Sequence, residues 1–168
     1  MADHAVGDDF DGDIFIYRGG RAPQHITHVL IDRSVDEIED DAFDDCEHLL
    51  TVDTHDGLRR VGKAAFRSCI SLRRINLRSA VEIDDSAFHC CENLESVEFG
   101  DRLERIGYLA FGECSSLTHL ELPHIITIEL GAFCDCERLT DIDLSERLET
   151  IEEVHSGAVS AYIVSPSH

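Results

Sequence analysis

The chain has 168 residues, 43% of them hydrophobic, and a formal net charge of -21 at pH 7. This length suits one domain with enough apolar content to bury a core. The 35 acidic side chains outnumber the 14 lysines and arginines by more than two to one. Nucleic acid and acidic membrane surfaces are therefore excluded as expected direct partners, because both are recognised by clustered positive charge.

Residues 1–24 combine an acidic run with the apolar stretch Ile14 to Tyr17. Repeat proteins need an atypical end unit, and we expect a capping strand here in which Ile14 and Ile16 supply the covering face. The segment has neither the basic start nor the apolar run of a secretory signal, and no stretch is long enough to span a bilayer. These features predict a cytoplasmic or nuclear protein with reduced thiols.

From residue 26 onward one skeleton recurs, A-F-x-x-C-x-x-L-x-x-V-x-F, which is most complete from Ala87 to Phe99. Its Ala-Phe pairs are 23, 22, 23 and 22 residues apart and end at Phe43, Phe66, Phe88, Phe111 and Phe133. A cysteine follows each Phe three residues later, at Cys46, Cys69, Cys91, Cys114 and Cys136. Such a period indicates a solenoid of stacked repeats in which each slot packs on itself.

Within a repeat, the L-x-x-V-x-F part alternates apolar and polar residues and predicts a strand with one buried face. A second apolar pair, as in Leu103-x-x-Ile106, predicts another short extended segment, and the Ala-Phe turn is expected to be a helical or 3₁₀ piece. The alternation in repeat length falls in 77–83 and 122–128, which we expect to be loops. The pattern ends after Ile151, and residues 156–168 either fold back over the last repeat or fray.

The skeleton resembles the BspA-like, or Treponema pallidum-type, leucine-rich repeats, with consensus L-x-x-V-x-L-P…L-x-x-I-x-x-x-A-F-x-x-C-x-x-L. Leu117 to Pro123 and Ile106 to Cys114 match it closely, and the resemblance covers residues 26–151. Among such proteins the chain is similar to large intracellular sets in microalgae such as diatoms. The resemblance implies a leucine-rich-repeat solenoid of the β-rich α/β class, a right-handed coil of about six repeats of 22–23 residues with a stacked parallel sheet.

Three regions follow from this pattern: an acidic segment with a capping strand at 1–24, the solenoid at 25–155 and a C-terminal tail at 156–168. The cysteine column is interpreted as small buried thiols. Cys90 and Cys134 lie outside that column and lack a second ligand pair at a familiar spacing. The Asp9-x-Asp11-x-Asp13 run is not a calcium loop, because Ile14 stands where the turn glycine is required. We therefore expect no metal site, no cofactor and no catalytic residues.

The solvent-facing positions of the strands form two columns. The first column contains His28, Thr51, Arg74, Ser96, His119 and Asp141, and the second contains Leu30, Asp53, Asn76, Glu98, Glu121 and Asp143. The second column is largely acidic, either because the whole protein is acidic or because a partner recognises it. The candidate partner-binding residues are Asp53, Arg74, Glu98, His119, Glu121, Asp141 and Asp143.

The sequence thus favours a non-enzymatic scaffold, expected to be a monomer, that binds a protein with a basic segment through its exposed strand face. Two alternatives stay open. One is a truncated or decaying member of the repeat family without a defined partner, suggested by the loss of pattern after Ile151. The other is a cell-surface adhesion module, as among bacterial and protist relatives, although the expected secretion signal is lacking.

Overall fold

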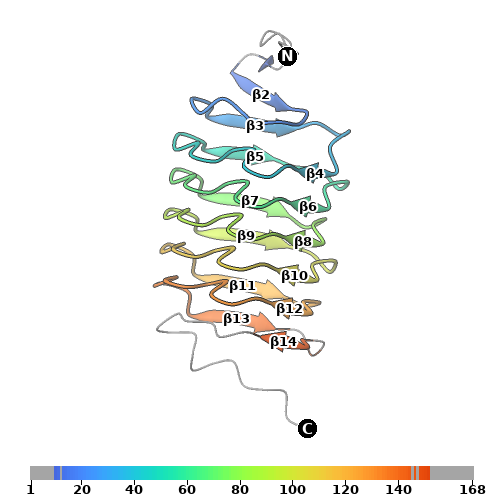
Figure 1. Ribbon diagram of the computed structural model, residues 1–168, viewed down its shortest axis with the longest axis vertical. Helices are drawn as coiled ribbons and strands as arrows, with labels where there is room; N and C mark the ends of the chain where they lie inside the picture. Colours follow the sequence, from blue (N-terminus) through green and yellow to red (C-terminus); the bar gives the residue numbers. More distant parts are fainter. Residues whose placement is uncertain (1–9, 12, 145, 147, 152–168) are drawn as a thin grey trace.

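A computed structural model describes residues 10–11, 13–144, 146 and 148–151 of the chain. The chain coils into a solenoid whose short strands stack along one long axis, with successive repeats in sequence order (Figure 1). Its first described strands, β1 (Phe10–Asp11) and β2 (Ile14–Tyr17), pair antiparallel, and β2 then pairs parallel with β3 (His28–Ile31). The described fold is therefore a parallel β-solenoid, as the repeat period predicts.

The longer strands lie side by side and form what we call the strand face. After β3 they are β5 (Thr51–Asp53), β7 (Arg74–Leu77), β9 (Ser96–Phe99), β11 (His119–Leu122) and β13 (Asp141–Leu144). Residues alternate between the core and solvent, as in β7, where Arg74 and Asn76 are exposed while Ile75 and Leu77 are buried. Hydrogen bonds join β2, β3 and β5, then β7 with β9, then β11 with β13. The predicted one-sided burial of these strands is thus confirmed.

On another side of the coil, two-residue strands form a second parallel sheet. They are β4 (Glu37–Ile38), β6 (Arg60–Val61), β8 (Glu82–Ile83), β10 (Arg105–Ile106), β12 (Thr127–Ile128) and β14 (Thr150–Ile151). The loops expected within 77–83 and 122–128 are confirmed, because β7 ends at Leu77 before β8 starts at Glu82, and β11 ends at Leu122 before β12 starts at Thr127.

The Ala-Phe turns are not helical, contrary to the expectation of a helix or 3₁₀ piece. In each repeat the backbone is left-handed directly before the Ala-Phe pair and again directly before the column cysteine, as at Asp41 (φ 56°) and Asp45 (φ 59°). This alternation turns every second N–H toward the next repeat, so that Phe43 N donates to Ala65 O at 2.7 Å. A helix would keep these bonds within its own turn. The described residues contain no helix able to cross a bilayer.

The phenylalanine column forms the centre of the core. The rings of Phe88 and Phe111 lie 5.1 Å apart with an interplanar angle of 4°, and the neighbouring pairs stack similarly. Tyr17 covers the N-terminal end of this column, with its ring 4.9 Å from that of Phe43. The expectation that Ile14 and Ile16 cover the core was wrong, because the register of β2 turns Phe15 and Tyr17 inward and leaves Ile14 exposed.

The cysteine column is buried and each thiol also bonds to the preceding repeat. Cys69 Sγ donates to the Phe43 carbonyl at 3.2 Å, and Cys91 Sγ donates to the Phe66 carbonyl at 3.0 Å. All seven cysteines are free thiols. Burial raises the pKa of Cys46 to about 11 and that of Cys136 to about 12, so both are protonated at neutral pH. The predicted packing of the column thiols is confirmed, and their hydrogen bonds add a second role.

Candidate functional site

The strand face carries all seven residues predicted to bind a partner. Strand register places His119 beside Asp141 and Glu121 beside Asp143, and all four side chains lie on the solvent side. Asp53, Arg74 and Glu98 occupy the same face on earlier strands. The two predicted columns therefore exist as continuous rows of outward side chains.

Charge and polarity change along this face. At its N-terminal end the apolar residues Ile14 and Leu30 are 39% and 41% exposed, beside the half-buried His28. Arginines occupy the middle, where Arg74 Nη2 lies 3.9 Å from Glu95 and Arg78 Nη2 lies 3.1 Å from Glu98. Glu98 is therefore partly neutralised, which separates it from the acids of the following two strands.

The C-terminal end of the face is acidic. We call Glu121, Asp141 and Asp143 the acidic patch. His119 lies among them, with Nε2 3.5 Å from Glu121 and Nδ1 3.4 Å from Asp141. The side chains of Glu121 and Asp141 are 76% and 68% exposed, so their charges face water and are available to a ligand. Neighbouring strands lie about 4.8 Å apart, well inside the roughly 8 Å screening length at physiological salt.

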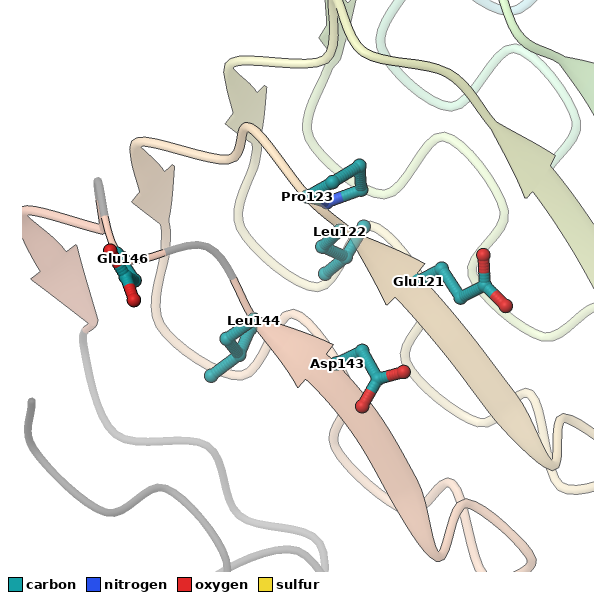
Figure 2. A pocket seen from close by; sticks show the side chains of 6 residues that line it. All are labelled: Glu121, Leu122, Pro123, Asp143, Leu144 and Glu146. Atoms are coloured by element: carbon teal, nitrogen blue, oxygen red, sulfur yellow. The ribbon is translucent and has the colours of Figure 1, made fainter.

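A shallow depression adjoins the acidic patch. It is lined by Glu121, Leu122, Pro123, Asp143, Leu144 and Glu146. Figure 2 shows the carboxylates of Glu121 and Asp143 directed to the same side of β11 and β13, while Leu122, Pro123 and Leu144 lie at the strand ends. Leu122 is buried, so the accessible apolar lining is the exposed Pro123 and the half-buried Leu144. An apolar edge beside carboxylates matches a lysine or arginine side chain, whose alkyl stem is apolar and whose end is charged.

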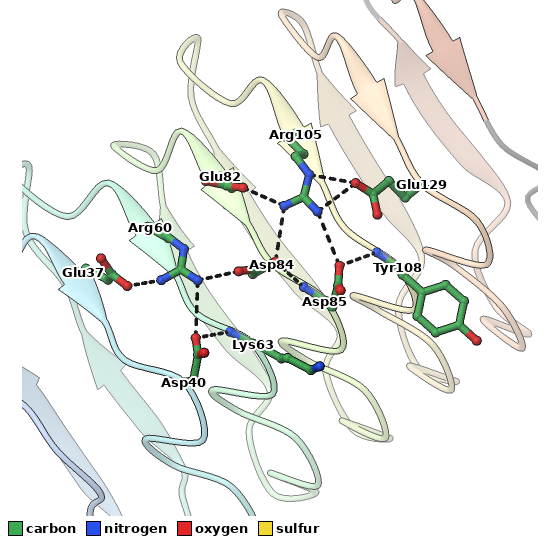
Figure 3. Close-up of polar contacts among 10 residues, drawn as sticks. All are labelled: Glu37, Asp40, Arg60, Lys63, Glu82, Asp84, Asp85, Arg105, Tyr108 and Glu129. Atoms are coloured by element: carbon green, nitrogen blue, oxygen red, sulfur yellow. Dashed lines mark hydrogen bonds and ion pairs between the residues drawn. The ribbon is translucent and has the colours of Figure 1, made fainter.

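The second sheet carries a ladder of ion pairs that the sequence analysis did not identify. Outward positions of β4, β6, β8 and β10 alternate in charge as Glu37, Arg60, Glu82 and Arg105. Figure 3 shows Arg60 bonded to Glu37, Asp40 and Asp84, and Arg105 bonded to Glu82, Asp84, Asp85 and Glu129. The signal for this ladder is the alternation of Glu and Arg directly before the Val or Ile of each second strand.

Asp84 connects the two arginines of this ladder. Its burial favours the neutral acid, but hydrogen bonds from Arg60, from the Asp85 amide and from Arg105 prevail and lower its pKa. Burial likewise opposes the charge of Arg105, whose pKa is nevertheless raised by hydrogen bonds to Glu129, Asp84 and Glu82. Each arginine is shared among several carboxylates, so we interpret the ladder as a structural link between repeats.

A third group lies on the Ala-Phe turns and was also missed from sequence. It contains His89, Cys90 and Glu113, whose metal-ligating atoms all lie within 4.8 Å of one another, and we call it the turn cluster. Cys90 and Glu113 occupy the same slot in successive repeats, 23 residues apart. Stacking of equal slots is the signal that could have revealed the pair, but spacing within one repeat could not.

The comparisons with known proteins identify the repeat. The profile described as BspA type leucine rich repeat region (6 copies) matches residues 22–124 and 79–155. A crystal structure of the Treponema pallidum leucine-rich-repeat protein shares 32% sequence identity with a TM-score of 0.68, and the match covers 77% of this chain and 62% of that one. No curated protein sequence matches the chain.

Two further solved structures support the fold alone. A leucine-rich-repeat protein from Eubacterium ventriosum gives a TM-score of 0.65 at 20% identity over 85% of this chain and 42% of that chain. A leucine-rich cell surface protein from Faecalibacterium prausnitzii gives 0.57 at 23% identity over 80% of this chain and 39% of that chain. This chain thus spans less than two thirds of the length of each of these proteins.

Proposed function

Because this chain belongs to the BspA-type leucine-rich-repeat family, we propose that it is a non-enzymatic scaffold that binds another protein through its strand face. The family itself suggests a protein-interaction scaffold, since stacked repeats build an extended surface. We propose the strand face as the binding surface because of how charge is distributed along it. We further propose a cytoplasmic or nuclear location, a monomeric state and kinship with the intracellular sets of microalgae, all of which remain predictions.

The acidic patch is the single observation that carries the proposal. Glu121 and Asp143 are adjacent on parallel strands and both face solvent, and the carboxylate of Asp141 lies beside His119. Holding like charges at this spacing is unfavourable unless a cation accompanies them. We infer that a basic segment of a partner protein supplies that positive charge.

The depression beside the patch gives the segment a place to dock. A lysine or arginine stem lying over Pro123 and Leu144 brings its charged end to the carboxylates of Glu121 and Asp143. The middle of the strand face is basic, around Arg74 and Arg78, and therefore repels the same segment. The partner is thus oriented with its basic part over β11 and β13.

Affinity capture from the native cell tests the proposal. The test variant replaces Glu121, Asp141 and Asp143 by Gln, Asn and Asn. A matched control makes the same charge change at Glu47, Asp56 and Asp101, which are exposed and lie outside the strand face. Partners retained by the wild type and by the control, but lost from the patch variant, support the scaffold. Equal retention by all three proteins contradicts a role for the strand face.

Salt separates specific capture from general attraction to an acidic protein. Capture through the patch should weaken steeply as the salt concentration rises, because exposed charges are screened. Any capture that remains with the patch variant should have a weaker salt dependence than that of the wild type. The same salt dependence in both proteins would contradict the acidic patch as the docking site.

A further inference from the structure

The turn cluster brings together an imidazole, a thiol and a carboxylate from two successive repeats, and we propose that it binds a zinc-class divalent cation. This site is separate from the strand face and does not depend on the scaffold proposal. Its three ligands are His89, Cys90 and Glu113. The fourth position of a tetrahedral site would be left to water.

His89 contacts both of the other ligands through its ring nitrogens. Its Nε2 lies 3.5 Å from Glu113 Oε1 and 4.0 Å from Cys90 Sγ, and the same sulfur lies 3.1 Å from Nδ1. A tetrahedral zinc ion, bound at its usual lengths, places such N and O atoms roughly 3.4 Å apart and such N and S atoms roughly 3.6 Å apart. Binding one ion at Nε2 therefore requires the His89 ring to turn so that Nε2, in place of Nδ1, faces the sulfur, and the Nε2–Sγ separation to shorten by a few tenths of an ångström.

The donor set selects the class of ion. Nitrogen, sulfur and oxygen ligands together are typical of zinc, whereas calcium and magnesium are bound by oxygen alone. On binding, the S–H bond of Cys90 breaks, its proton passes to solvent and the thiolate forms the metal–sulfur bond. His89 contributes the lone pair of a neutral ring and Glu113 its carboxylate.

The backbone holds two of the ligands in place. Cys90 and Glu113 are both left-handed, with φ of 61° and 60°. Cys90 N donates to Gly112 O at 2.9 Å, and Glu113 N donates to Cys134 O at 2.7 Å, so each ligand residue is tied to the following repeat. The two side chains therefore start from equivalent positions one repeat apart.

Gly112 makes room for the third ligand. A Cβ atom at this position would lie 2.8 Å from His89 Cδ2, closer than real Cβ contacts allow. The absence of a side chain at residue 112 is thus what lets the imidazole lie across the repeat boundary toward Glu113. This space is a second observation, independent of the distances among the ligand atoms.

The surroundings favour a cation. The Cys90 thiol interacts electrostatically with the carboxylates of Glu113 and Glu92 and with the positive charge of Arg67. Arg67 is itself held by Asp44 through two hydrogen bonds of 2.8 Å, which offsets its charge. The Glu113 side chain is 55% exposed, so an ion can reach the cluster from solvent.

Titration of the full chain with Co²⁺, a spectroscopic substitute for zinc, tests the site. We expect one equivalent to produce thiolate-to-cobalt absorption, which Zn²⁺ then displaces. Cys90→Ser should abolish this absorption, and His89→Gln and Glu113→Gln should weaken binding at least tenfold, taking about that factor as the least effect of losing a ligand. Ser68 already occupies the slot of Cys90 in the preceding repeat with φ 58°, so serine is compatible with the turn.

Two further variants distinguish ligation from charge. His119→Gln removes a histidine that also lies beside two carboxylates, but on the strand face, and should leave binding unchanged. Gly112→Ala keeps all three ligands yet displaces the His89 ring, and should weaken binding. Absorption that survives Cys90→Ser, or that His119→Gln reduces as much as His89→Gln, would overturn the proposal.

Alkylation provides a readout within the same molecule. Cys90 and Cys134 are the two cysteines outside the buried column, and both are partly exposed. Zn²⁺ should protect Cys90 from alkylation at least about tenfold while leaving Cys134 reactive, as measured by mass spectrometry of peptides. Equal protection of both residues, or of neither, would contradict the proposed site.

Discussion

The thiol of Cys91 donates a hydrogen bond of 3.0 Å to the carbonyl oxygen of Phe66 in the preceding repeat. Cys114 bonds in the same way to Phe88, and Cys136 bonds to Phe111. The cysteine slot therefore selects for a small side chain that is apolar enough for the core and is also a donor. This explains the cysteine better than size alone, because alanine would also fit the column.

Replacement of Cys91 separates the two roles of the thiol. Cys91→Ala loses the bond to Phe66 and leaves a small void, so we expect a loss of about 1 to 2 kcal/mol in the free energy of unfolding. Cys91→Ser keeps a donor and should be less destabilising than Cys91→Ala. Urea denaturation measures both variants. A serine variant less stable than the alanine variant would show that the thiol acts only as an apolar filler.

The phenylalanine column should be the most sensitive part of the core. Phe88 is fully buried between the stacked rings of Phe66 and Phe111. Phe88→Ala should therefore lower the free energy of unfolding by about 3 to 5 kcal/mol. Tyr108→Ala is the control, because that residue is 44% exposed and its replacement should lower the free energy of unfolding much less. Equal denaturation midpoints for Phe88→Ala and the wild type would be incompatible with this packing.

Much of the fold was predictable because each repeat packs on its neighbours. The period of the Ala-Phe pair places Phe88 against Phe111, and alternation within the strand turns Glu121 and Asp143 to solvent. The first inference needs the repeat period, and the second needs only the order of residues within a strand. The family profile and the related solved structures agree with that pattern.

The turn conformation and the side-chain groups were not predictable in the same way. Left-handed backbone is expected of glycine, yet Asp41, Ala64 and Ser86 adopt it here, so composition hides the turn type. The pairing of Cys90 with Glu113 follows from the stacking of equal slots, but the residue types in those slots differ, so no repeated motif marks it. The position of His89 close to both residues depends on how the turn directs its side chains.

Asp84 should make stability depend on pH at the acid end. Although burial opposes its charge, Arg60 and Arg105 bring its folded pKa below the ordinary 3.8. Its contribution is therefore complete above pH 3.8 and is lost as the pH falls through the folded pKa. Asp84→Asn should lower the free energy of unfolding by about 1 to 3 kcal/mol at neutral pH, since hydrogen bonds to charged groups contribute about that much.

On acidification the free energy of unfolding of Asp84→Asn should fall less than that of the wild type, because the variant no longer has this carboxylate to protonate. Urea denaturation at neutral pH and below pH 3 measures the difference, with the exposed Asp56→Asn as the control. If acidification lowered the free energy of unfolding equally in Asp84→Asn and the wild type, the assigned role of Asp84 between the two arginines would be contradicted.

Repulsion within the acidic strand column should be measurable in the isolated protein. Replacing Glu98, Glu121 and Asp143 by Gln, Gln and Asn should raise the melting temperature slightly, because exposed like charges on neighbouring strands repel. Glu121 and Asp143 should account for most of the rise, since Glu98 is paired with Arg78. Added salt should reduce the difference, and a lower melting temperature for the variant would contradict the repulsion.

Site-specific photo-crosslinking tests the proposed scaffold most directly. A photoreactive residue at position 119 lies among Glu121, Asp141 and Asp143 on the strand face, whereas one at position 108 replaces an exposed tyrosine on the Ala-Phe turns. We predict that position 119 crosslinks a captured partner through its basic segment and that position 108 does not. Crosslinking from position 108 with none from position 119 would contradict binding through the strand face.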